Sequence, residues 1–263
     1  MDKIDLIRIG IFLGALILFS AAEALWPKRP RLQNRFRRWI TNVGFVVIGS
    51  LSLQLLGPLI AVGIAAWASL KGWGLLNIID APLWLELTIA FIVLDFAIWW
   101  QHVLSHKIPI LWRLHKVHHA DRDLDASSGV RFHPIEIFLS MIYKCGVVCL
   151  LGPPVIAVVI FEITLNAMAI FNHANLALPR GIDSPLRKII VTPDMHRVHH
   201  SVIWQESQKN YGFNLSIWDR LFKTYQAAPQ AGQQGMALGL SDAQTNDPQY
   251  LGWSLWLPFR KYK

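Results

Sequence analysis

Long apolar segments separated by short polar ones dominate this sequence. The first extends from about Ile4 to Trp26, which is long enough to cross the roughly 30 Å hydrocarbon core of a bilayer. Further apolar segments lie at 39–70, 83–100 and 134–171. Because a chain that crosses a bilayer must satisfy its own backbone hydrogen bonds, these segments predict helices. We therefore expect an all-α integral membrane protein with about four to five transmembrane or re-entrant helices.

The composition supports this class. Hydrophobic residues make up 53% of the 263 residues and charged residues only 16%, which is too apolar for an ordinary soluble domain. The net charge of +8 would suit a nucleic-acid partner, but the basic residues are spread along loops instead of forming a stripe with aromatic side chains. No nucleic-acid partner is expected. Cys145 and Cys149 lie four apart in an apolar stretch, which predicts small buried side chains.

A basic segment sets the predicted orientation. The sequence PKRPRLQNRFRR at 27–38 contains six basic residues and no acidic one. The positive-inside rule places it in the cytoplasm and the N-terminus outside. The first apolar segment is predicted to be an anchor, because no small-residue cleavage site follows a short apolar core. Counting membrane crossings from there places the C-terminal ends of the apolar segments 83–100 and 134–171 in the cytoplasm. The chain from Asn172 onward is then also cytoplasmic.

Two apolar segments contain helix breakers. Residues 39–70 are predicted to form one helix with slack around Gly57 and Pro58, and a tight hairpin is the alternative. The sequence GPP at 152–154 predicts that residues 134–171 form a helical hairpin that dips into or across the bilayer and returns.

All ten histidines lie on the predicted cytoplasmic side. His102 and His106 are spaced i, i+4, so both project from one face of a helix. The pattern H-x-x-H-H occurs at 115–119 and again at 196–200, and on a helix these positions also share a face. Eight histidines exceed what one divalent ion binds, and neutral imidazole suits iron, zinc, copper or nickel. The clusters predict two neighbouring metal ions held by a cytoplasmic helical cap.

Other readings explain the clusters less well. A single histidine at a membrane edge ordinarily makes hydrogen bonds only, but three clusters on one side are unusual for that role. A non-enzymatic membrane metal or haem protein, either a transporter or an electron carrier, is the alternative function. Transport ligands should lie near the bilayer midplane, and a carrier haem usually needs one histidine on each of two facing helices. A zinc protease is disfavoured because H-E-x-x-H does not occur.

The histidine motifs also carry a family resemblance. H-x3-H at 102 and H-x2-H-H at 115 and 196 resemble the histidine boxes of the fatty acid hydroxylase and sterol desaturase superfamily of membrane di-iron oxygenases. The resemblance covers roughly residues 90–226. The flanking sequences that share it are DFAIWWQHVLSH, FHPIE at 132–136, FNHANL at 171–176, TPDMHRVHH and NYGFNLSIWDRLFKTY.

The resemblance implies a specific chemistry. The expected cofactor is two Fe ions in a non-haem centre, a site that zinc can occupy in purified protein. The centre would use dioxygen to hydroxylate or desaturate a lipid such as a fatty acyl chain or a sterol, in lipid biosynthesis, and we favour hydroxylation. Electrons would come from a separate donor, cytochrome b5-like or ferredoxin-type. The expected location is a bacterial inner membrane or the endoplasmic reticulum.

The resemblance also identifies candidate ligands. The expected metal-binding residues are His102, His106, His115, His118, His119, His173, His196, His199 and His200, with His133 as a further candidate. The position four after His173, where some members of the superfamily have another histidine, is Ala177. This leaves the last ligand of one metal open among water, Asn172 and Asn175.

Acidic residues near the motifs are candidates for supporting roles. Asp95 lies seven residues before His102, so a carboxylate on nearly the same helix face could accept an imidazole N–H. Asp194 and Asp219 are similar candidates, with capping or ion pairing as the alternative. The predicted division of the chain is N-terminal membrane anchor helices at 1–82, a histidine-box di-iron catalytic core at 83–226 and a C-terminal cytoplasmic tail at 227–263.

Overall fold

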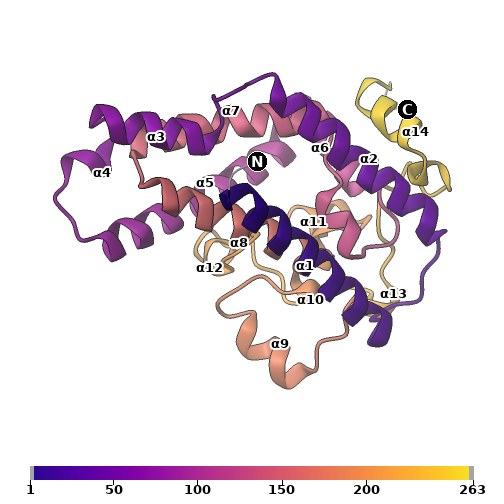
Figure 1. Ribbon diagram of the computed structural model, residues 1–263. Coiled ribbons are helices and arrows are strands. Elements are labelled where there is room, and N and C mark those ends of the chain that lie inside the picture. The colour runs from indigo at the N-terminus through magenta and orange to yellow at the C-terminus, as the bar shows by residue number, and fades with distance from the viewer. Residues whose placement is uncertain (1–2, 261–263) are drawn as a thin grey trace.

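The computed structural model describes residues 3–260, and within this range the chain forms helices with no strand, only three isolated β-bridges (Figure 1). The longer helices are α1 (Lys3–Leu25), α2 (Arg35–Gln54), α3 (Ala61–Lys71), α5 (Leu83–Lys107), α6 (Pro109–His119), α7 (Pro134–Leu151) and α8 (Val155–His173). The short ones are α4 (Leu75–Ile78), α9 (Arg180–Leu186), α10 (Pro193–His199), α11 (Trp204–Ser207), α12 (Ile217–Leu221), α13 (Gly232–Gly235) and α14 (Leu251–Trp256). Three 3-10 turns complete the set: η1 (Ala126–Val130), η2 (Asp247–Gln249) and η3 (Leu257–Phe259).

Four helices are long and apolar enough to cross a membrane. They are α1, α5, α7 and α8, with 23, 25, 18 and 19 residues. At 1.5 Å per residue the shortest is about 27 Å long, close to the roughly 30 Å hydrocarbon core. This confirms the predicted all-α membrane class.

The prediction that residues 39–70 form a single helix is wrong, because the structure has two helices there. α2 ends at Gln54 and α3 begins at Ala61. Between them Gly57 has a φ of +54°, a left-handed conformation that glycine adopts without steric cost, and Pro58 has no N–H for a helical hydrogen bond. Both helices pack against α7, so the chain follows α7 along an interrupted path (Figure 1).

Residues 134–171 form α7, a tight turn and most of α8, with the break between the helices at the predicted GPP sequence. Gly152 ends α7 with a φ of +62° and donates its N–H to the carbonyl oxygen of Val148 at 2.8 Å. The side-chain amide of Asn77 donates to the carbonyl oxygen of Gly152 at 2.8 Å, which ties the α4 region to this turn. α3 and α5 each pack against both arms of the hairpin.

Three helices near the histidines begin with a proline. Pro109, Pro134 and Pro193 start α6, α7 and α10, where a missing N–H costs nothing and the fixed φ suits the first helical turn. The bend at Ile108–Pro109 ends α5 and lets α6 fold back against it. This bend brings two histidine clusters that are adjacent in sequence face to face.

Candidate metal centre

Nine of the ten histidines converge into two adjoining groups. The first group is His102, His106, His115, His119 and His199, and the second is His118, His173, His196 and His200. Within each group the candidate ligand nitrogens all lie within 4.8 Å of one another, and every one of the nine side chains is buried. The groups touch, since the rings of His119 and His200 stack with centroids 4.4 Å apart.

Four helices contribute to the two groups, and helical geometry decides which residue joins which. α5 supplies His102 and His106, α8 supplies His173 from its last residue, and α6 carries the first H-x-x-H-H motif. The second motif lies on α10 and ends with His200, the residue directly after that helix. Residues at i and i+4 differ by about 40° around a helix, whereas i and i+3 differ by about 60° in the opposite sense. Accordingly His115 and His119 face the first group while His118 faces the second.

The second H-x-x-H-H motif divides in the same way. His196 and His200 face the second group, and His199 faces the first. Each motif therefore serves both groups, which refines the expectation that its three histidines share one face. The split gives two adjacent groups, each of which could hold a metal ion.

Backbone carbonyls fix the tautomer of four rings. The Nδ1–H groups of His102 and His173 donate to the carbonyl oxygens of Tyr211 and Ala169, both at 2.6 Å. Those of His118 and His199 donate to the carbonyl oxygens of Arg131 at 3.1 Å and Lys209 at 2.8 Å. Because a carbonyl only accepts, Nδ1 carries the proton in each neutral ring, and Nε2 is left with a lone pair.

These lone pairs point at one another. Nε2 of His102 lies 3.0 Å from Nε2 of His199, and Nε2 of His118 lies 3.0 Å from Nε2 of His173. Neither pair has a proton to share, so only a cation makes the arrangement favourable. Two nitrogens at about 2.0–2.1 Å from one ion and at right angles are about 3.0 Å apart, as observed. The donor set thus fits metal ions that prefer imidazole nitrogen.

Five of the converging histidines outside the membrane-spanning helices are held neutral. Burial, followed by the neighbouring imidazoles, lowers the pKa of His118, His119, His196 and His200 well below the usual value. The same causes lower the pKa of His199 to about 3. Neutral imidazole is the form that binds a metal, so the rings need no deprotonation at neutral pH.

A carboxylate on α7 supports the first group and was missed from the sequence. Glu136 Oε1 accepts from Nδ1 of His115 at 2.6 Å, the usual arrangement for a metal-binding histidine. The side-chain amide of Gln208 lies 3.1 Å from Nδ1 of His106. An acidic residue in the first turn of an apolar helix, as in FHPIE, was the available signal for Glu136.

His133 lies outside both groups. Its Nδ1 accepts from the backbone N–H of Ile135 at 3.3 Å at the start of α7, and its Nε2 lies 3.3 Å from the carbonyl oxygen of Leu255. His133 is thus the N-cap of α7. The structure therefore gives no support to His133 as a ligand.

Asp95 does not contact an imidazole, and Asp194 has the ion-pairing role that was its alternative. Asp95 accepts from the Trp218 indole N–H at 2.8 Å and the Leu215 N–H at 3.2 Å, not from an imidazole. It shares a helix face with His102, but seven residues separate them by about 10 Å along the axis. Asp194 is two residues from His196, hence on the opposite side of α10, where it pairs with Lys28 at 2.6 Å and with Arg197.

Asp219 supports the centre through the backbone. It is fully buried, and its carboxylate accepts from the N–H groups of Tyr211 at 2.9 Å and Gly212 at 2.8 Å. The carbonyl of Tyr211 is the group that orients His102. Asp219 therefore holds in place the loop segment that sets the tautomer of His102.

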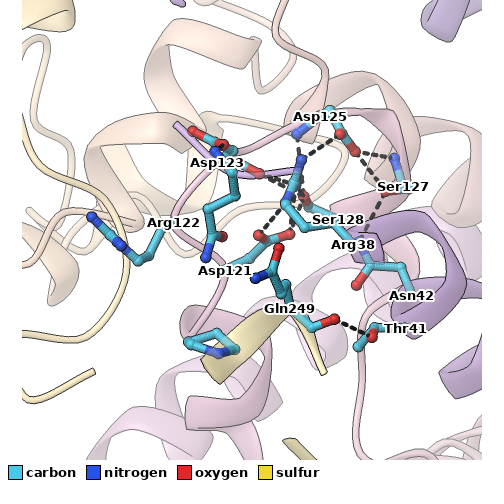
Figure 2. A network of polar contacts seen from close by, with 12 residues as sticks. Arg38, Thr41, Asn42, Asp121, Arg122, Asp123, Asp125, Ser127, Ser128 and Gln249 are labelled. Carbon is cyan, nitrogen blue, oxygen red and sulfur yellow. Dashed lines mark hydrogen bonds and ion pairs between the residues drawn. The ribbon is translucent and has the colours of Figure 1, made fainter. Parts of the chain in front are cut away.

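A buried network around Arg38 holds the chain that follows α6 (Figure 2). Arg38 projects from α2, is fully buried, and donates to Asp121 at 2.7 and 2.8 Å and to Asp125 at 2.7 Å. Burial alone would raise the pKa of Asp121, but the guanidinium of Arg38 outweighs this effect and lowers that pKa to about 2. Ser128 donates to Asp121 at 2.7 Å and closes the network. Because Asp121 lies only two residues after His119, the last residue of α6, the network anchors the end of that helix.

An apolar cavity leads to the histidines from the membrane-spanning helices. It has a volume of about 650 Å³ and lies among α1, α2, α5, α7 and α8. His102, His115 and Glu136 line one end. Trp112, which does not line the cavity, packs on His106 with ring centroids 4.9 Å apart and contacts Trp204 at 5.5 Å. The first group is thus contacted by the cavity and by an indole.

Comparison with known proteins gives one family. A family model described as fatty acid hydroxylase matches residues 87–224, just over half of the chain. An ornithine lipid hydroxylase, OlsE, of Rhizobium tropici is 25% identical over 225 residues, which cover 84% of this chain and 67% of that protein. No solved structure matches.

Alkylglycerol monooxygenases are also similar. The human protein is 30% identical over 172 residues, covering 65% of this chain and 37% of its own length. The Danio rerio protein is 35% identical over 144 residues, covering 54% of this chain and 30% of its own length. The matched region thus spans only about a third of these monooxygenases. The family match includes all nine converging histidines, and the chain belongs to the fatty acid hydroxylase family.

Proposed function

We propose that this protein is a membrane-bound non-haem di-iron oxygenase that hydroxylates a lipid whose alkyl chain lies in the cavity. Its family and its hydroxylase and monooxygenase relatives identify it as an oxygen-dependent oxidoreductase acting on lipids. The observation that carries the di-iron proposal is the pair of imidazole groups whose unprotonated Nε2 atoms face one another at about 3.0 Å. The similarity to a hydroxylase and to monooxygenases favours hydroxylation over desaturation.

The residues of the chain have defined tasks in this proposal. The nine histidines would hold two irons, and the carbonyls and Glu136 keep the Nδ1 protons in place so that Nε2 stays available. The chemistry that the irons supply when bound is the activation of dioxygen with electrons from a separate donor. The apolar cavity would exclude water and position one alkyl carbon beside His102 and His115.

The relatives suggest the kind of substrate. Their names specify an ornithine lipid and an alkylglycerol, which both combine a polar group with an alkyl chain. The cavity, apolar along most of its lining and open to the histidines at one end, fits the same class. We therefore propose an amphiphilic lipid as the substrate.

Isotope labelling tests the function. The full chain would be expressed in a heterologous host under 18O2, and the lipid extract analysed by mass spectrometry. We expect lipids that have gained one 18O atom with the wild type and with His133→Ala, but not with His118→Ala or His199→Ala. Lipids that lose two hydrogens without gaining 18O would indicate desaturation instead. Haem absorption with no lipid product would point to an electron carrier.

We also propose that the histidine groups face the cytoplasm, because the basic segment before and within α2 lies at the same end of the molecule. Cysteine labelling in a variant without Cys145 and Cys149 tests this. A membrane-impermeant maleimide should modify Asp80→Cys in intact cells and Ser241→Cys only after lysis. Both positions are exposed. The reverse pattern would overturn the orientation.

A further inference from the structure

Two polar side chains of the cavity wall bind each other beside the first group of histidines. Gln101 of α5 directly precedes His102, and Ser140 of α7 lies one turn beyond Glu136. Both line the cavity, and the Ser140 hydroxyl donates to Oε1 of Gln101 at 3.1 Å. Because Glu136 binds His115 at 2.6 Å, Ser140 lies only about 6 Å along α7 from a residue that orients the centre. An amide and a hydroxyl thus lie together near the histidines in a mostly apolar wall.

One face of α5 is turned toward the cavity. Ile98, Gln101, His102 and Ser105 all line it, and they occupy positions i, i+3, i+4 and i+7 of the helix. The Ser105 hydroxyl donates to the backbone carbonyl of Gln101 at 3.0 Å, so it does not occupy the side-chain amide. The Gln101 amide and the His102 ring are therefore presented side by side to the same space.

The side-chain amide of Gln101 can make further hydrogen bonds. A glutamine side chain carries one acceptor oxygen and two N–H donors. Ser140 engages the oxygen, and no residue among 3–260 accepts from the nitrogen. Gln101 is half-buried and lines the cavity, so a ligand there can reach its side chain. A polar group within a membrane helix is costly unless it has a partner, and the N–H groups therefore favour a ligand with an oxygen acceptor.

The remaining lining suits an alkyl chain. Apolar side chains such as Phe12 and Leu165 contribute to it from α1 and α8. Arg8 and Lys144 also line the cavity, but each already binds the carboxylate of Glu162, at 2.6 and 2.8 Å. The volume of about 650 Å³ falls within the range of about 300–1,000 Å³ that is typical of pockets for one small ligand. The cavity thus combines an apolar space for a chain with an available amide beside the histidines.

We propose that the side-chain amide of Gln101 donates a hydrogen bond to a neutral oxygen of the lipid, an ether or hydroxyl oxygen, and that Ser140 positions this amide. This inference rests on the proposed function and names its substrate class. Because Gln101 and His102 are neighbours on one helix face, the bound oxygen keeps the reacting carbon within a few bonds of the polar end of the lipid. The alkyl chain then extends away from the histidines.

Ligand binding by the purified full-length protein tests this contact. It is measured under nitrogen, where no turnover occurs, by displacement of tritiated hexadecyl methyl ether. The competing probes are hexadecyl methyl ether, heptadecanol and octadecane, which have the same number of non-hydrogen atoms and differ in one oxygen. All variants are compared in one detergent, so the partition of each probe into micelles cancels. An ether oxygen only accepts, whereas a hydroxyl also donates, so comparing the two probes identifies the kind of oxygen that is bound.

Gln101→Met replaces the amide by an apolar side chain of similar length. We expect the preference for the oxygen-containing probes over octadecane to fall by about threefold to tenfold, as the loss of one neutral hydrogen bond would give. The binding of octadecane should change by less than about threefold, which shows that the cavity is intact. Ser140→Ala should lower the preference by a smaller factor, because the amide is then present but not held in place.

Asn166 offers a matched control. It also carries an amide and lines the cavity, but it lies seven residues before His173 on α8, about 10 Å along the axis. Asn166→Leu should leave the preference unchanged. An unchanged preference in Gln101→Met, or a preference lost in Asn166→Leu instead, would show that the lipid oxygen binds elsewhere and would overturn the inference.

The position of hydroxylation gives a second readout. Under 18O2, fragment ions of the labelled lipid should place the 18O atom within a few carbons of the oxygen-bearing end for the wild type, and Gln101→Met should spread it over more positions. Label at the far end of the alkyl chain in the wild type would overturn the inference. Because the binding measurements need neither dioxygen nor iron, they decide it even if the proposed oxygenase activity fails.

Discussion

At the scale of single residues, the hydrogen bonds behind the histidines matter as much as the histidines. Four backbone carbonyls and one carboxylate each contact an Nδ1 atom, and they leave Nε2 free to face the centre of its group. Without these partners each ring could adopt the other tautomer or rotate away. Imidazoles held in this way need little reorganisation when a metal binds.

Glu136 gives a residue-scale prediction. In Glu136→Ala the Nδ1 atom of His115 loses its only charged partner, so we expect metal affinity to fall by about 10- to 100-fold. Glu136→Gln keeps an oxygen acceptor for His115, so its metal affinity should fall less than that of Glu136→Ala. Metal retention against a competing chelator measures both, and Ser140→Ala, one turn later on α7, serves as the control. Unchanged retention in Glu136→Ala would show that His115 is oriented by packing alone.

At the scale of elements, α2 acts on the centre from a distance. It contributes no histidine, yet Arg38 secures the segment 121–128 that follows α6. Arg131 continues the connection, because its guanidinium donates to the carbonyl of Val117 at 2.8 Å while its own carbonyl accepts from His118. The C-terminal segment joins through Ser254, which accepts from Arg131 at 2.6 Å. α2, α6 and the C-terminal segment thus form one rigid support.

Neighbouring arginines on α2 allow a matched test of this support. Arg38→Met leaves Asp121 and Asp125 buried without their main partner, which should destabilise the fold by about 3–5 kcal/mol. Arg37→Met removes an exposed arginine and should cost less than about 1 kcal/mol. Thermal unfolding in detergent would compare the two, and Arg38→Lys should rank between them. Equal stability of the Met variants would show that the network is not a support.

At the scale of the whole molecule, the elements that depend on local pattern were predictable. Hydropathy predicted the helices long enough to span a membrane, and the GPP sequence predicted the turn between α7 and α8. The i, i+4 spacing predicted that His102 and His106 belong to the same group of histidines. The break at Gly57–Pro58 was visible in the sequence, but an uncharged stretch of that length fits one helix as well as two. Whether this segment forms one helix or two depends on how it packs against α7.

Contacts between distant parts of the chain were not predictable. The partners of Arg38 and His115 lie 83 and 21 residues away, and no local pattern encodes such pairs. The partners of Asp95 and Asp194 were not predictable for a related reason. Position around a helix says nothing about distance along its axis, and one of the two cations that pair with Asp194, Lys28, lies 166 residues away in sequence.

The central claim is that two irons are held by two groups of histidines, and metal analysis of the purified full chain tests it most directly. Elemental analysis and Mössbauer spectroscopy would be applied to the wild type, His118→Ala, His199→Ala and the control His133→Ala. We expect two antiferromagnetically coupled irons per chain in the wild type and in His133→Ala, and loss of the coupled pair in the other two. A single tightly bound zinc, bound haem, or coupled irons retained in all variants would contradict the account.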